Sequence, residues 1–120
     1  MKADTLVSGT PFFGKLNGDY SMKNKIRAIH PGEILREELN TIGLSANAFA
    51  HRLHVPTNRI TAILNEERSV TPETAIRLSQ FFGTAPEFWL NLQRDFDLKI
   101  AIKRVGKKIL KDIEPFDKAA

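Results

Sequence analysis

Four polar side chains that can recognise nucleobases lie close together near the middle of the chain: Thr57, Asn58, Arg59 and Thr61. Arginine can bind guanine through two hydrogen bonds, asparagine can bind adenine in the same way, and threonine can donate, accept or touch a thymine methyl group. None of the four is acidic, so the group would not repel phosphates. These residue types at this spacing predict contacts with the base edges of nucleic acid.

The chain around these residues must hold them on a short helix. In the stretch HRLHVPTNRITAIL, residues 51–64, apolar residues recur at helical spacing on both sides of His54-Val55-Pro56. Proline fits a helix start, where an amide hydrogen would have no partner within the helix. The pattern predicts two short helices joined by a tight turn, a helix-turn-helix unit whose second helix can enter the DNA major groove.

The turn departs from the usual pattern at His54, where glycine is the commonest residue. The backbone is usually left-handed there, and histidine is among the residues that tolerate this conformation. Small Ala50 would let the two helices approach, and Val55 would close the joint from the inside. The expected apolar face consists of Leu53, Ile60, Ile63 and Leu64. Helix pairs like this also occur in all-α proteins that bind no nucleic acid, so the motif alone leaves that alternative open.

Further helices flank the pair, and their ends are marked by proline, glycine and hydroxyl side chains. The first helix runs from Pro31 to a stop at Gly43, and Ser45 is the expected cap of the helix before the turn. Thr71 caps a fourth helix, with Pro72 in its first position, and Gly83 ends it.

A fifth helix is predicted to follow at once, because Thr84 and Glu87 match a capping box. We expect Trp89 and Leu92 to close the core and Phe96 to lie at a subunit contact. No segment shows an alternation of apolar and polar residues that is long enough to predict a β-strand. The sequence therefore predicts an all-α protein with at least five helices.

The composition narrows the class of protein. The chain has 120 residues, no cysteine and a net charge of +4, with a pI of about 9.6. The absence of cysteine excludes disulfides and thiolate zinc sites. The positive charge mildly favours phosphate-bearing partners. No apolar run approaches the roughly 18 residues of a membrane span, and the N-terminus lacks a signal-peptide pattern. We therefore expect a cytoplasmic protein without membrane contacts.

The chain divides into three predicted parts. Residues 1–24 form a flexible arm, residues 25–97 the helix-turn-helix domain, and residues 98–120 a basic helical tail. Patterned sequence begins after Met22, which suggests that Met22 is the biological start. Mass spectrometry of the native protein that detects Met1 would refute this hypothesis.

Two other groups of residues have side chains that could take part in metal binding or acid–base chemistry. His51 and His54 stand one turn apart, but two imidazoles without a nearby carboxylate make a poor metal site. Glu33, Glu37 and Glu38 crowd the first helix and fit a solvated face better than a catalytic pair. With no nucleophile, metal set or glycine-rich loop in view, we expect no enzymatic activity, no metal and no cofactor.

Four segments together resemble a known family: IHPGEILREEL, LSANAFAHRLHVPTNRITAILN, VTPETAIRLSQFFGTAPEFWLNLQ and FDLKIA. They look like HigA-type antitoxins, also called virulence-associated protein I, which belong to the Cro/C1 (lambda-repressor-like) helix-turn-helix group. The likeness runs from Ile29 to Ala101 and weakens toward Pro115, while residues 1–21 are not covered. The segment GTAPEFWLNLQ is specific to the family, whereas the helix-turn-helix by itself is not.

The resemblance implies a five-helix domain that forms a homodimer and binds a palindromic operator ahead of its own operon. It also implies a partner, a HigB-type toxin that cleaves mRNA at the ribosome and is neutralised by the antitoxin. By position, the reading helix is Pro56–Leu64 and the base contacts are Thr57, Asn58, Arg59 and Thr61. The implied phosphate contacts are Ser45, Asn47 and Asn65. A free-standing regulator without a toxin, and a protein-binding module that only inhibits one, remain alternatives.

The segment LKIAIKRVGKKILKDI reads as a basic amphipathic helix. Its apolar side consists of Leu98, Ile102, Val105 and Ile109, and its basic side of Lys99, Lys103, Lys107 and Lys111. Gly106 should weaken it by roughly 1 kcal/mol relative to alanine. Such a helix could meet a membrane surface, flanking DNA, the toxin or a second subunit. A contact with the second subunit or the toxin is preferred, a solvated tail comes second and a membrane surface third.

Overall fold

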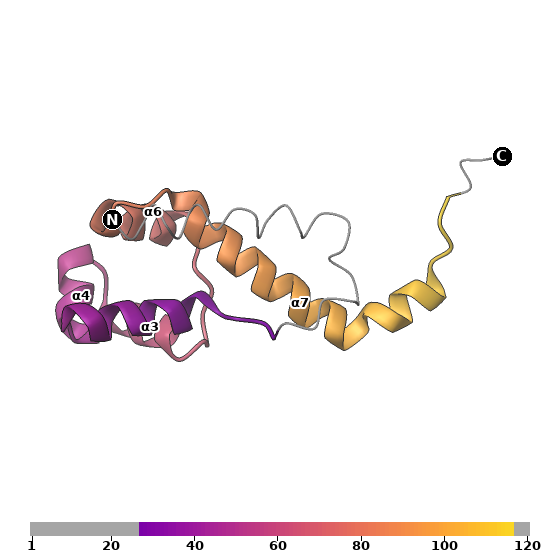
Figure 1. Ribbon diagram of the computed structural model, residues 1–120, viewed down its shortest axis with the longest axis horizontal. Helices are drawn as coiled ribbons and strands as arrows, with labels where there is room; N and C mark the ends of the chain where they lie inside the picture. Colours follow the sequence, from indigo (N-terminus) through magenta and orange to yellow (C-terminus); the bar gives the residue numbers. More distant parts are fainter. Residues whose placement is uncertain (1–26, 117–120) are drawn as a thin grey trace.

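The computed structural model describes residues 27–116, which contain five α-helices and no strand. The helices are α3 (Pro31–Ile42), α4 (Ala46–Leu53), α5 (Thr57–Leu64), α6 (Pro72–Phe82) and α7 (Pro86–Asp112) (Figure 1). The predicted all-α, five-helix architecture is confirmed. The predicted arm over residues 1–24, and with it the Met22 hypothesis, lies outside the described residues.

Local signals define most of the helix ends. The Ser45 hydroxyl accepts from the Ala48 amide at 3.1 Å and caps α4. The Thr71 hydroxyl accepts from the Thr74 amide and caps α6. Gly43 and Gly83 end α3 and α6 in the left-handed conformation, with φ of 74° and 77°, which glycine adopts without a steric penalty. These predicted boundaries are confirmed.

The capping box predicted at the start of α7 is wrong. The residue before the helix is Ala85, and no side chain caps the first turn. The Thr84 hydroxyl instead accepts a hydrogen bond from the indole Nε1 of Trp89 at 2.9 Å. A buried indole N–H needs a hydrogen-bond acceptor. The Thr84 hydroxyl serves as that acceptor for Trp89 and therefore does not cap the helix.

The cap of α3 is the buried imidazole of His30, which the sequence did not reveal. Its Nδ1 accepts a hydrogen bond from the Gly32 amide at 2.8 Å, and its ring meets the half-buried Phe96 edge-on at 4.8 Å between centroids. Phe96, predicted at a subunit contact, thus packs against His30 within the same protomer. Burial is the main cause that lowers the pKa of His30, against the charges of Glu66 and Asp97, which raise it.

We expect stability to fall as the pH is lowered from about 6.5 to about 5.5, because of His30. The native imidazole stays neutral while the unfolded one takes up a proton near its ordinary pKa of 6.5. Stability is therefore flat above that pKa and declines below it, toward the lower native pKa. Thermal unfolding across this range measures the effect. His30→Asn keeps a capping acceptor and should lose the decline, and an unchanged pH profile in this variant would refute the assignment.

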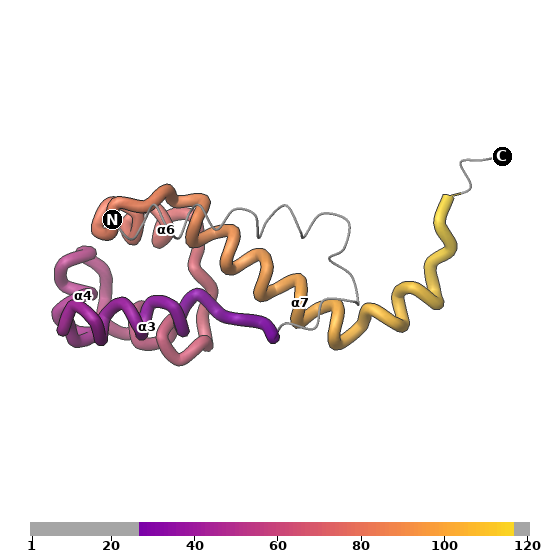
Figure 2. Tube along the Cα trace, viewed as in Figure 1, coloured from indigo at the N-terminus to yellow at the C-terminus, as the bar shows by residue number. Residues whose placement is uncertain are grey.

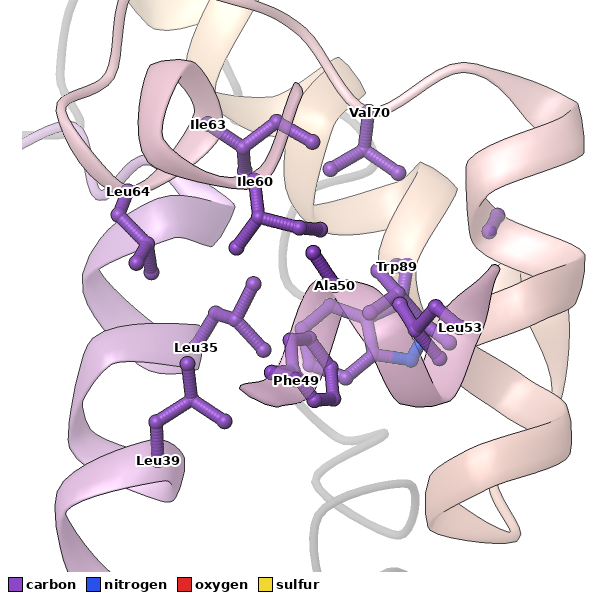
Figure 3. Packing of buried hydrophobic residues seen from close by; sticks show 12 residues of the cluster. Leu35, Leu39, Phe49, Ala50, Leu53, Ile60, Ile63, Leu64, Val70 and Trp89 are labelled. Atoms are coloured by element: carbon purple, nitrogen blue, oxygen red, sulfur yellow. The ribbon is translucent and has the colours of Figure 1, made fainter. Parts of the chain in front are cut away.

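The core lies where α3, α4, α5 and α6 converge on the start of α7. Figure 3 shows Leu35 and Leu39 pointing from α3 toward α4 and α5. On the far side, the ring of Phe49 lies 5.1 Å from that of Phe81. Trp89 is buried as predicted, and Leu92 packs against the core at its edge. The cluster consists of Leu35, Leu39, Phe49, Ala50, Leu53, Ile60, Ile63, Leu64, Val70, Ala75, Leu78 and Trp89.

Helix α7 is much longer than the others, at 27 residues, or about 40 Å at 1.5 Å per residue. Figures 1 and 2 show its second half extending away from the other four helices. The helix continues through Gly106. The predicted domain boundary between residues 97 and 98 falls inside this helix, so that division stays a prediction. None of the described helices is long and apolar enough to cross a membrane.

Candidate nucleic-acid interface

The turn between α4 and α5 has the geometry that the sequence predicts. His54 adopts the left-handed conformation, with φ 59° and ψ 46°. The Val55 amide donates to the Ala50 carbonyl at 3.1 Å, and the Val55 side chain packs against the core. The left-handed residue and this hydrogen bond end α4 as a helix C-terminal capping motif does. The chain changes direction immediately after it. Pro56 then precedes the first residue of α5.

Close packing of the two helices leaves one side of α5 exposed. Ala50 is buried where α4 meets α5, and Leu53, Ile60 and Ile63 are buried as predicted. Asn58 on the opposite side is exposed, while Thr57 and Thr61 are half-buried. The interruption at His54 therefore does what the sequence implied: it presents a short helix with its polar side outward.

A side-chain hydrogen bond joins the two helices at this surface. The Thr57 hydroxyl donates to Oδ1 of Asn47 at 2.8 Å, which brings a predicted base contact and a predicted phosphate contact together. Because Oδ1 is the acceptor in this bond, the amide Nδ2 of Asn47 keeps its two donors for an outside acceptor such as a phosphate oxygen. The Thr61 hydroxyl bonds back to the carbonyls of the preceding turn of α5.

The far end of α5 is held by Arg36 of α3. Its Nη2 donates to the Leu64 carbonyl at 3.1 Å and to Oδ1 of Asn65 at 3.2 Å. Asn65, a predicted phosphate contact, thus lies exposed beside a cation. Sequence reasoning missed Arg36, because nothing local indicates that a residue 29 positions earlier reaches the end of this helix.

Arg59 lies on the flank of α5 that faces α6, apart from Asn58. Its Nη1 is 3.8 Å from Oε1 of Glu73, and its side chain is only 22% exposed. Glu73 also accepts from Arg77 at 2.9 Å. The hydrogen bond from Arg77, followed by the charge of Arg59, lowers the pKa of the Glu73 carboxyl. Glu73 would therefore compete with DNA for the guanidinium of Arg59. The sequence around Arg59 gives no sign of this contact.

Arg77 ties this network to the end of α4, because its Nη1 donates to the Leu53 carbonyl at 2.9 Å. That carbonyl belongs to the last turn of α4, where no helical amide is available. The spacing of Glu73 and Arg77 by four residues was a visible signal for an ion pair on α6, although its link to α4 was not.

Histidine and acidic side chains are the possible metal-binding and acid–base groups among the described residues. Residues 27–116 contain no group of three or more His, Cys, Asp or Glu that could hold a metal ion. Glu33 pairs with Arg27 at 2.6 Å, and this hydrogen bond is the main cause that lowers the pKa of Glu33. Of the other carboxylates of α3, Glu37 is exposed and Glu38 is partly exposed.

The short helix pair, the left-handed turn and the exposed polar side of α5 define a helix-turn-helix protein of the Cro/C1 class. A family model described as helix-turn-helix matches residues 35–89. The chain is 54% identical over 80 residues to virulence-associated protein I of Dichelobacter nodosus, covering 66% of this chain and 74% of that relative.

Two solved structures are similar over most of the chain. One is an addiction module antidote protein of the HigA family from Coxiella burnetii, with 59% identity and a TM-score of 0.74, over 76% of this chain and all of that one. The other is the Pseudomonas aeruginosa antitoxin HigA with the higBA promoter, with 42% identity and a TM-score of 0.73, over 75% and 99%. The chain belongs to the HigA family of helix-turn-helix antitoxins. This family consists of DNA-binding antitoxins and regulators and is not an enzyme family.

Proposed function

We propose that this protein is a dimeric, sequence-specific DNA-binding antitoxin that represses its own toxin–antitoxin operon and neutralises a HigB-type mRNA endonuclease. The observation that carries the DNA-binding part is the surface at the start of α5. There, exposed Asn58 lies next to the hydrogen-bonded pair Asn47 and Thr57. A similar protein, at 42% identity, has been solved with promoter DNA.

Each polar residue of this surface has a proposed role. Asn58 reads a base edge, with adenine as the preferred partner of an amide, and Thr57 and Thr61 line the same side of α5. Arg59 reads guanine once DNA draws it from Glu73. The amide of Asn47, the first turn of α4 after Ser45, and Asn65 beside Arg36 bind backbone phosphates.

The second half of α7 is the proposed dimer surface. Leu98 and Ile109 are 40% and 47% exposed although they are large and apolar, and they share one side of the helix with Ile102 and Val105. A second copy of the chain would remove this side from water. The dimer would place two reading helices about 34 Å apart, in successive major grooves of a palindromic operator.

The toxin partner rests on family membership. A short ribonuclease-like reading frame directly beside the gene would support it, and copurification of the two products would test it directly. If the neighbourhood holds no such gene, a free-standing repressor is the better description, and the DNA-binding part of the proposal is unaffected.

We expect Asn58→Ala to weaken binding to the region upstream of its own gene by about 1–3 kcal/mol, and to weaken binding to a scrambled duplex much less. The reason is that a base contact distinguishes sequences whereas a phosphate contact does not. Fluorescence anisotropy with the two labelled duplexes measures both affinities.

Asn40→Ala is the matched control, because Asn40 is an exposed asparagine on α3. It should leave both affinities unchanged. Equal losses on the two duplexes for Asn58→Ala would contradict its reading role. A wild-type protein that retains neither duplex at low salt would refute DNA binding altogether.

A further inference from the structure

The charge of this protein is unevenly distributed along the chain. Residues 27–97, which hold the helix-turn-helix, contain seven arginines and nine acidic side chains, a net charge of −2. Residues 98–112, the second half of α7, contain six lysines and arginines and one aspartate, a net charge of +5. The part that presents the reading helix is therefore slightly acidic, and the positive charge lies on the helical extension.

The cations at the reading surface are also partly engaged. Arg59 faces Glu73 at 3.8 Å, Arg77 is bonded to the same carboxylate, and Arg36 donates to the end of α5. Affinity for DNA comes largely from neutralising phosphates. A helix-turn-helix domain of net negative charge needs a further source of that affinity.

The extension has the required surface. Lys103, Lys107 and Lys111, which we call the basic row, are exposed and follow one another at four-residue spacing. At 100° per residue they lie opposite the apolar side that contains Leu98 and Ile109. Among residues 98–112, the only ion pair that the structure contains joins Lys108 to Asp112. The basic row thus points away from the proposed dimer surface, and no carboxylate neutralises it.

We propose that the basic row binds the phosphate backbone of DNA, as a second contact in addition to the one made by the reading helix. The inference rests on the proposed DNA-binding function and extends it. The row spans about 12 Å, enough to meet several phosphates, since a duplex carries one charge per roughly 1.7 Å of axis. The contact is independent of sequence: it adds affinity, while specificity comes from α5.

The test uses the full-length protein and two triple variants, K103Q/K107Q/K111Q and K103R/K107R/K111R. Binding to the upstream duplex and to a scrambled duplex is measured from about 50 to about 200 mM salt. The slope of log K against log salt is negative, and the glutamine variant should make it less steep on both duplexes alike. The expected change is up to about 3 per protomer, at roughly 0.9 per phosphate contact. The arginine variant keeps the charge and should retain the wild-type slope.

Circular dichroism and sedimentation check that the glutamine variant keeps its helix and its oligomeric state. Glutamine is as good a helix former as lysine, so no folding defect is expected. An unchanged slope in a variant that still binds the upstream duplex would overturn this inference but not the proposed function. If such a variant also loses wild-type binding to phosphatidylserine vesicles, the row is a membrane contact instead. Absence of all DNA binding by the wild type would refute both proposals.

Discussion

Replacing Gly32 by alanine is expected to destabilise the fold by about 3 kcal/mol. An added Cβ at this position would lie 1.9 Å from the carbonyl oxygen of Ile63 and 2.9 Å from its carbonyl carbon. Both are backbone atoms near the end of α5, so no side-chain rotation can relieve the clash. The first turn of α3 and the last turn of α5 would have to separate, and the reading helix would move with the change.

Urea denaturation measures the loss, and Gly43→Ala is the control. Gly43 has open space around its Cα, but its φ is +74°, so alanine there should cost only about 1 kcal/mol through backbone strain. Gly32→Ala should also lower affinity for the upstream duplex under conditions where it is fully folded. Equal losses for the two variants would show that α3 and α5 accommodate the added Cβ at little cost, and would contradict this prediction.

Phe49→Ala should cost about 4 kcal/mol, because a fully buried aromatic side chain is lost and a cavity remains. Phe49 has no exposed surface. Its ring lies 5.1 Å from Phe81 and 5.8 Å from Phe82, and Phe82 in turn lies 5.7 Å from Trp89. This chain of rings joins α4 to α6 and α7, so its removal loosens the first helix of the helix-turn-helix.

The same denaturation experiment provides the measurement, with Phe116→Ala as the control. Phe116 is 85% exposed, and its loss should change the unfolding free energy by less than about 0.5 kcal/mol. A total stability of 5–15 kcal/mol is usual for a domain, so a loss of this size removes a large share of it. A loss of only about 1 kcal/mol would mean that neighbouring rings refill the site.

Much of the fold was predictable because its signals are local. Ser45, Thr71, Gly43 and Gly83 act within a few residues of their own positions, and the apolar residues of α4 and α5 recur at helical spacing. The start of α7 shows where such local signals fail. Thr84 has the right type and spacing for a capping box, but the indole of Trp89 uses its hydroxyl, and that contact depends on how α7 packs.

The candidate interface was predictable in position but not in its contacts. The spacing of residues 51–64 located the turn and the exposed side of α5. The partner of Arg59 was not visible, because Glu73 reaches it only through the crossing of α5 and α6. The link from Arg36 to Asn65 likewise depends on the packing of α3 against α5. Such contacts between distant parts of the chain decide which side chains are free to bind DNA.

The hydrogen bond from Thr57 to Asn47 has a consequence for association. Ordering a flexible side chain at an interface costs about 0.5–1.5 kcal/mol of conformational entropy. Here two such side chains already restrain one another before any DNA arrives. Under the proposed function, part of the DNA-contacting surface would be pre-organised, so more of the interaction energy would remain as measured affinity.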